Sequence, residues 1–191
     1  MTTHASPANA ATDLNTFLAG VHEAAEQDLA SPVEVVDLQA IPDDIGKLPF
    51  GKNQAGSYVW RKIADAAVVV TDLKASTAVS YSKQDRVGAR LYEASTGGCV
   101  KVLNRFSPGF VDIQGDGVFA IFTGDRFLER ALCAAVSLNT FGQNLRRTLA
   151  KELGDDVREM RESGLRIGAD RGALLVKRIG VRGTHNEPVW A

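Results

Sequence analysis

Two aspartates stand beside apolar segments in an arrangement that indicates a metal site. Asp72 follows the run Val68–Thr71, and Asp116 lies in a Gln-Gly-Asp-Gly turn between the apolar segments 110–113 and 118–122. Such a run predicts a strand covered on both faces, where an unpaired carboxylate costs several kcal/mol. Two converging carboxylates repel each other unless a divalent cation separates them. Mg²⁺ takes one or two protein carboxylates together with water and phosphate oxygens, so the pair indicates metal-assisted chemistry on a phosphate compound.

Each aspartate also has a purely structural interpretation. Asp-Gly between apolar runs is a strong hairpin signal, so a turn alone would explain Asp116. Asp72 could cap the helix that follows, although Ser76 and Thr77 are competing caps. The occurrence of two aspartates at strand ends is what favours metal binding.

Three segments of the chain resemble, in order and in approximate spacing, the core motifs of class III nucleotide cyclases. They are Thr71–Thr77, Ile113–Phe122 and Leu165–Val176, and the resemblance covers about residues 60–191. The first segment, Thr-Asp-Leu-Lys-Ala-Ser-Thr, is similar to a signature of the pyrimidine nucleotide cyclases of bacterial Pycsar antiphage systems. The resemblance implies an enzyme that makes a 3′,5′-cyclic nucleotide and pyrophosphate from a nucleoside triphosphate. It also implies a head-to-tail homodimer with composite active sites, which produces a second messenger in antiviral defence.

The resemblance assigns roles to individual residues. It implies that Asp72 and Asp116 bridge two Mg²⁺ or Mn²⁺ ions about 3.5–4 Å apart, with the carbonyl of Leu73 completing one shell. Backbone amides that turn into a helix N-terminus suit the triphosphate. The residues that supply them are Lys74, Ala75, Ser76 and Thr77.

Base selection rests on the residue four positions before Asp116. The family typically has Lys there for adenine and Glu for guanine, whereas this chain has Asp112, and the partner position holds Pro188. A purine-reading pair is therefore absent, which favours UTP as substrate and cyclic UMP as product. CTP is the alternative, because Asp112 could accept a hydrogen bond from the cytosine amino group.

Tyr58 and Arg105 could contact the base as a stacking ring and as a donor, and each also has a structural interpretation. Four further basic residues near the chain end could meet phosphate or simply be surface charges: Arg171, Lys177, Arg178 and Arg182.

Two other functions remain open at this point. A catalytically silent domain of the same fold, acting in nucleotide sensing or dimerisation, would have no need of both aspartates. An enzyme related to polymerases or diguanylate cyclases would also bind metal through two carboxylates. The Gly-Gly-acid-acid-Phe hairpin that is usual in diguanylate cyclases is absent from this sequence, which has Gln-Gly-Asp-Gly instead.

The elements that must position these residues predict an α+β fold with a ferredoxin-like βαββαβ core. The pair Gly97-Gly98 weakens the first core helix by about 1 kcal/mol per glycine, which predicts a bend or break there. The expected elements are a strand at 66–73, a helix at 85–103, a hairpin at 110–122, a helix at 126–152, and strands at 165–170 and 173–179 separated by Arg171-Gly172.

The N-terminal part predicts a helix from Asp13 to Ser31, a strand at 33–38 and a wrapping linker at 41–57. Apolar residues recur at helical spacing along the helix, so this stripe must be buried on its own core or on a second subunit.

We therefore divide the chain into an extension, 1–57, and a cyclase domain, 58–191. In the family a helix with an Asn and an Arg follows the Val-Trp near residue 190, so the domain is expected to be incomplete at its C-terminus. The apolar stripe of the helix expected from Asp13 to Ser31 consists of Leu14, Phe17, Leu18, Val21, Ala25 and Leu29.

Composition argues against other partners and locations. The net charge is −1, with 45% hydrophobic and 24% charged residues, so the sequence predicts neither a nucleic-acid nor a membrane-surface binder. No apolar run approaches the roughly 18 residues of a membrane span, and no secretory signal is apparent. The two cysteines, Cys99 and Cys133, lack metal-ligand spacing and are expected to be buried thiols of a reducing compartment. We therefore expect a cytoplasmic protein.

Overall fold

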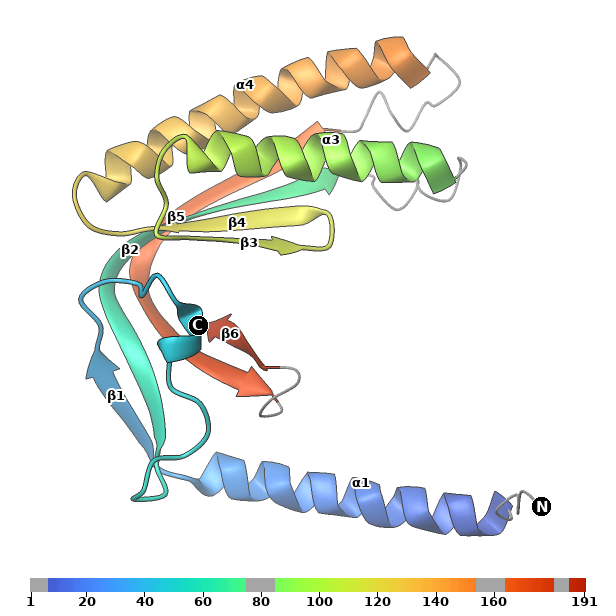
Figure 1. Cartoon of the computed structure of the whole chain (residues 1–191), viewed down its shortest axis with the longest axis vertical. Helices are drawn as coiled ribbons and strands as arrows, with labels where there is room; N and C mark the ends of the chain where they lie inside the picture. The colour runs from blue at the N-terminus through green and yellow to red at the C-terminus, as the bar shows by residue number, and fades with distance from the viewer. Residues whose placement is uncertain (1–6, 75–84, 154–163, 181–185) are drawn as a thin grey trace.

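The computed structural model describes residues 7–74, 85–153, 164–180 and 186–191, which form a six-stranded sheet and its helices (Figure 1). The strand order is β3-β4-β2-β5-β6, and β1 pairs with β2 in parallel. The chain order of elements confirms the predicted α+β fold with a βαββαβ core and an N-terminal helix. The elements are α1 (Pro7–Ala30), β1 (Val33–Asp37), the 3₁₀ helix η1 (Ile45–Lys47), β2 (Tyr58–Lys74), α3 (Asp85–Asn104), β3 (Phe110–Gln114), β4 (Gly117–Phe122), α4 (Phe127–Leu153), β5 (Gly164–Gly180) and β6 (Asn186–Trp190).

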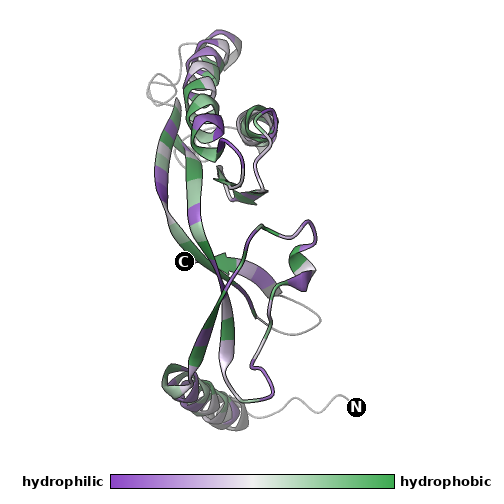
Figure 2. Ribbon diagram, turned by 90° about the vertical axis from the view of Figure 1, so that its left-hand side faces the viewer, coloured by the Kyte–Doolittle hydropathy of each residue, from purple (hydrophilic) through white to green (hydrophobic). Residues whose placement is uncertain are grey.

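The strands β2 and β5, each of 17 residues, form the spine of the molecule. They run from the helix layer at one end to α1 at the other (Figure 2). Alternate β2 residues are buried under α3 and α4, because successive side chains of a strand point to opposite faces. This core includes Ala67 and Val69, which share a buried cluster with Leu138 of α4, and Leu73, which shares a second cluster with Leu145 of α4. In the described part of the chain, the other face of the sheet carries no α-helix.

The helix α3 is continuous through Gly97-Gly98, so the predicted bend or break was wrong. The reason lies in the packing of α3 on α4. A Cβ added at Gly98 would come within 2.1 Å of the Phe141 ring, whereas one at Gly97 would meet only Glu93 Oε1, at 4.0 Å. Gly98 therefore allows Phe141 to pack directly against the α3 backbone, and this contact compensates for the low helix propensity of glycine.

The strand β5 passes through Arg171-Gly172 without a turn, which corrects the prediction of two strands. At this point β2 has a register irregularity between Ile63 and Ala66. Arg171 extends across it and makes two hydrogen bonds to Asp65, at 2.8 and 2.6 Å. The Arg-Gly pair thus belongs to a bulge in a long strand pair. The sequence also did not predict β6, which pairs with the last residues of β5.

The N-terminal part begins helical structure earlier than expected, at Pro7 instead of Asp13. The segment after β1 wraps around the lower half of the sheet: Leu48 is buried, and Pro49 O accepts a hydrogen bond from Arg178 N. The prediction for the cysteines was correct for Cys99, which is buried, and wrong for Cys133, which is exposed on α4. Among the described residues, no helix is long and apolar enough to cross a membrane.

Candidate active site

The β2–β4 pairing places the two aspartates at the same end of the sheet. Thr71 is paired with Val118, so the antiparallel register continues from Asp72 and Leu73 toward the turn that carries Asp116. Gly117 allows this close approach, because a Cβ there would lie 2.9 Å from Thr71 O. The two strand ends therefore converge as the sequence predicted.

Burial shows which face of the sheet Asp72 occupies. Thr71 and Leu73 are 1% and 2% exposed and point to the helix-covered core. Asp72 lies between them in the strand and points to the helix-free face, with 47% of its side chain exposed. The Leu73 side chain is therefore a core group, and only its backbone carbonyl is a candidate ligand.

Arg166 is a residue of this site that the sequence interpretation missed. It is paired with Asp72 in the β2–β5 register, and its Nη1 lies 3.5 Å from Asp72 Oδ2. The signal that could have found it is the pairing of the first and last core strands expected for the fold, which places the segment Leu165–Val176 beside Asp72. The basic residues named instead make other contacts: Arg171 binds Asp65, Lys177 Nζ donates to Gly51 O, and Arg178 donates to Gly46 O. Arg182 lies outside the described residues.

The donor set fits a hard divalent cation. Two carboxylates and a backbone carbonyl are oxygen ligands of the kind that Mg²⁺ and Mn²⁺ prefer. Within the described ranges no group of three or more His, Cys, Asp or Glu side chains could hold a metal. A cation here would therefore take its remaining ligands from water and from phosphate, which leaves space for a nucleotide.

The predicted phosphate-binding residues are only partly described. Lys74 is exposed at the end of β2, directly after Leu73 and two positions after Asp72. Ala75, Ser76 and Thr77 lie outside the described residues.

The predicted base contacts lie at three different places. Asp112 is on β3, paired with Phe119, and its Oδ1 accepts from the backbone N–H of Ile113 at 2.9 Å. Arg105 follows α3 and precedes β3, so it lies at the opposite end of β3 from the Asp116 turn. Tyr58 begins β2 and donates its hydroxyl to Asp28 of α1. A single chain therefore brings neither Arg105 nor Tyr58 to the two aspartates.

A hollow of about 380 Å³ lies on the helix-free face beside the site. Phe119 of β4 and Pro188 of β6 line it, together with Gln114, which is next but one to Asp116 in the chain. Trp190 also lines it, with a buried Nε1 that has no hydrogen-bond partner in the described part of the chain. The hollow thus joins the position of Pro188 to the strands that carry Asp112 and Asp116.

Comparisons with known proteins identify relatives in sequence and in fold. No protein-family model matches the chain. Over 180 residues, 94% of its length, the chain is 41% identical to a uridylate cyclase of Micromonospora echinofusca, and it covers 56% of that protein. It is 39% identical over 137 residues, 71% of its length, to a uridylate cyclase of Propioniciclava tarda, and it covers 44% of that protein. The chain thus spans about half the length of the curated relatives it matches.

Solved structures show the same fold at low identity. A class III adenylyl cyclase-like ATP-binding protein from Pseudomonas aeruginosa superimposes with a TM-score of 0.59 at 21% identity, over 88% of this chain and 37% of that one. The adenylyl cyclase CyaB from P. aeruginosa gives a TM-score of 0.58 at 15% identity, over 69% of this chain and 67% of that one.

Proposed function

The chain has the class III nucleotide cyclase fold and is homologous to uridylate cyclases along most of its length, and on this premise we propose that it converts UTP to 3′,5′-cyclic UMP and pyrophosphate. We assign residues 58–191 to the catalytic domain and residues 1–57 to an N-terminal extension. The observation that carries the proposal is the convergence of three motifs at one end of the sheet. Each contributes one charged residue there: Asp72, Asp116 and Arg166.

Asp72, Asp116 and the Leu73 carbonyl would hold two Mg²⁺ or Mn²⁺ ions. Bound cations of this kind lower the pKa of an attacking hydroxyl and stabilise charge on the transferring phosphoryl group. Arg166 faces the same space and offers a planar set of donors that suits phosphate oxygens. Lys74 and the amides of residues 75–77 would bind the rest of the triphosphate.

The base would lie toward Asp112 and Pro188. Pro188 offers no side-chain hydrogen bond, and Asp112 is shorter by one methylene than the Glu of guanine-reading sites, which disfavours both purines. Uracil has two carbonyl acceptors and one N–H. A site built for one set of base hydrogen bonds rejects another strongly, because a mismatch leaves buried polar groups unpaired. The curated relatives, both uridylate cyclases, support the choice of UTP over CTP.

The enzyme would act as a head-to-tail homodimer. The helix-free face that carries Asp72 also exposes the apolar side chain of Val70, which is 45% exposed. A second copy covering this face would bury Val70 and could bring base contacts to the aspartates that one chain keeps apart. We further propose a cytoplasmic location, where UTP is available, and a second-messenger role in antiviral defence, on the resemblance to Pycsar cyclases.

The experiment is to incubate the purified chain with UTP and Mn²⁺ and to identify the products by mass. We expect cyclic UMP and pyrophosphate from the wild type and neither from Asp72→Ala or Asp116→Ala, both of which should remain folded. Near-normal turnover by Asp116→Ala would refute the assignment.

A further inference from the structure

The helix α1 exposes an apolar stripe to solvent. Leu14, Phe17, Leu18 and Val21 are 50–64% exposed, although their spacing places them on one side of the helix. An exposed apolar face of this kind is typical of an interaction surface. Figure 1 shows α1 projecting from the lower end of the sheet, with the helix layer at the other end.

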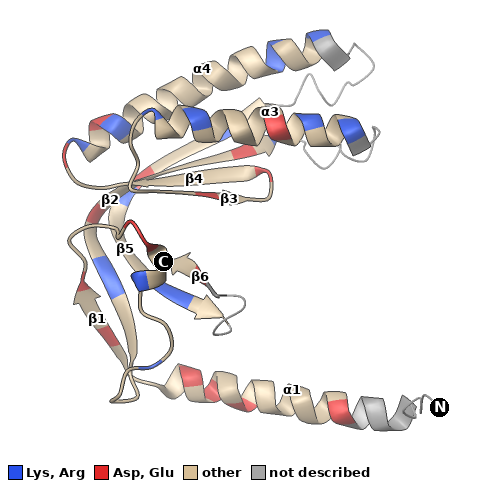
Figure 3. Cartoon of the chain, in the orientation of Figure 1, with Lys and Arg blue, Asp and Glu red and all other residues tan. Residues whose placement is uncertain are grey.

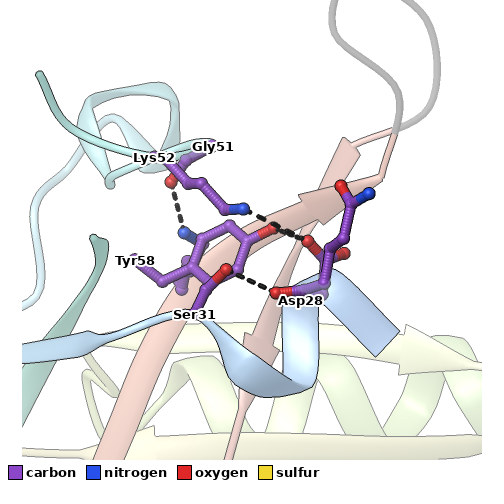
Figure 4. A network of polar contacts seen from close by, with 7 residues as sticks. Asp28, Ser31, Gly51, Lys52 and Tyr58 are labelled. Carbon is purple, nitrogen blue, oxygen red and sulfur yellow. Dashed lines mark hydrogen bonds and ion pairs between the residues drawn. The ribbon is translucent and has the colours of Figure 1, made fainter. Parts of the chain in front are cut away.

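Contacts at its C-terminal end fix the direction in which α1 projects (Figure 4). The Tyr58 hydroxyl donates to Asp28, and Lys52 Nζ lies 3.6 Å from the same carboxylate. Lys52 and Lys177 also lie over the Tyr58 ring, at 4.9 and 4.2 Å from its centroid. Ser31 Oγ donates to Gln27 O at 2.6 Å. The helix therefore leaves the sheet at a set angle, with its stripe free.

A second exposed stripe of matching composition lies on α4. Its first half is apolar: Leu128, Leu132 and Val136 are 39%, 64% and 59% exposed. Its second half is basic, and Arg146 and Arg147 line a hollow of about 630 Å³ there. A further hollow of about 340 Å³ lies between Val136 and the β5 residues Leu165 and Ile167. The surface has the form of a groove along α4.

We propose that α1 of one chain packs parallel to α4 of a second copy and clasps it. This inference rests on the homodimer of the proposed function. In α1 the apolar residues Leu14–Val21 come first and the acids Glu26 and Asp28 follow; in α4 apolar residues come first and Arg146, Arg147 and Lys151 follow. A parallel arrangement therefore matches apolar with apolar and acidic with basic. Figure 3 shows acidic but no basic residues along α1, and Lys and Arg toward the end of α4.

The lengths and directions of the two helices fit this arrangement. They have 24 and 27 residues, so they can pack along most of their lengths. In Figure 1 they run in opposite directions across the molecule. A second copy that is related by a two-fold axis along the line of sight of Figure 1 has all its helix directions reversed in this view. The α1 helix of that copy is therefore parallel to α4 of the first copy.

Pairing of α1 with another α1 is disfavoured by charge. The helix Pro7–Ala30 contains four acids, Asp13, Glu23, Glu26 and Asp28, and no Lys or Arg. A symmetric pair would bring like charges together, which is destabilising at close helix positions.

The test uses the native Cys133, which is exposed beside Leu132 on α4. A single cysteine is introduced in the α1 stripe, as Leu18→Cys or Val21→Cys, and the chain is mildly oxidised and run on a non-reducing gel. The matched control, Glu23→Cys, lies on the opposite side of α1. Burial raises the pKa of the Cys99 thiol, so this second native cysteine should not compete.

We expect a covalent dimer from the stripe variants, at least tenfold more than from Glu23→Cys, and its loss when Cys133→Ser is added. We also expect Arg146→Glu with Arg147→Glu to weaken the cross-link, and Glu26→Lys in the same chain to restore part of it. A cross-link that survives Cys133→Ser would show α1–α1 pairing and overturn the proposal. An uncross-linked chain that is dimeric and makes cyclic UMP would overturn the clasp alone, whereas an inactive monomer would overturn the proposed function as well.

Discussion

Arg166 lies directly across the β2–β5 pair from Asp72, with Nη1 3.5 Å from the carboxylate oxygen Oδ2. Both side chains are partly exposed on the helix-free face, so the contact is a weak surface ion pair, worth about 0–1 kcal/mol. The pair therefore adds little to the stability of the sheet. Its placement suits a guanidinium that neutralises the carboxylate in the free protein and contacts phosphate when a nucleotide and its cations bind.

Replacing Arg166 should therefore affect turnover and not folding. We expect Arg166→Gln to lower kcat/KM for UTP about 100-fold, the usual cost of removing a donor aimed at developing charge. The matched control is Arg171→Gln, which removes an arginine of the same strand that binds Asp65. Equal turnover by the two variants would show that Arg166 does not contact the substrate.

Cation binding should be measurable without catalysis. With Mn²⁺ and a non-cyclisable UTP analogue at about 100 times their dissociation constant, stabilisation should reach about 2.7 kcal/mol. For a chain of this size this corresponds to a rise in Tm of about 5–10 °C. Asp72→Asn and Asp116→Asn should lose this rise, EDTA should abolish it, and Asp65→Asn should keep it. A full rise in Asp116→Asn would place the cations elsewhere.

The two adjacent glycines of α3 should respond to alanine in opposite directions. Gly98→Ala should destabilise the protein by about 1–3 kcal/mol, because its Cβ would meet the Phe141 ring. Gly97→Ala has space and should stabilise it by up to about 1 kcal/mol through helix propensity. Urea unfolding measures both, and Phe141→Leu should recover part of the loss in Gly98→Ala. Similar effects of the two substitutions would contradict the close packing of α3 on α4.

The anchor of α1 should depend on pH at the alkaline end. Donation to Asp28, followed by burial and the negative charge of Asp28, raises the pKa of Tyr58 above its ordinary value near 10. The anchor is therefore intact below pH 10 and is lost as pH rises through the raised pKa. The difference in phenolate absorbance between wild type and Tyr58→Phe follows this titration. Asp28→Asn should move it back toward pH 10, and an unchanged midpoint would contradict the hydrogen bond.

Local patterns in the sequence predicted the core elements and the position of Asp72 and Asp116 at the same end of the sheet. Alternating and continuous apolar runs identify strands and helices, and the Asp-Gly turn fixes the β3–β4 hairpin. Arg171-Gly172 was misread as a turn because its ion pair with Asp65 comes from a residue 106 positions away. The continuity of α3 likewise depends on Phe141 of another helix.

The candidate site could be predicted only in part for the same reason. Asp72 and Asp116 stand out because carboxylates at strand ends are unusual. Arg166 does not, because its role appears only when the β2–β5 register places it opposite Asp72. Tyr58 and Arg105 were selected for their chemistry. The fold places Tyr58 at the opposite end of β2 from Asp72, and Arg105 at the opposite end of β3 from the Asp116 turn.

The most direct test of the central claim is a competition among the four ribonucleoside triphosphates. The purified chain is incubated with equal concentrations of ATP, GTP, CTP and UTP and with Mn²⁺, and the cyclic products are separated and identified by mass. Asp72→Ala serves as the blank. We predict 3′,5′-cyclic UMP as the main product, with cyclic CMP as the next most abundant. Cyclic AMP or cyclic GMP as the main product would contradict the account.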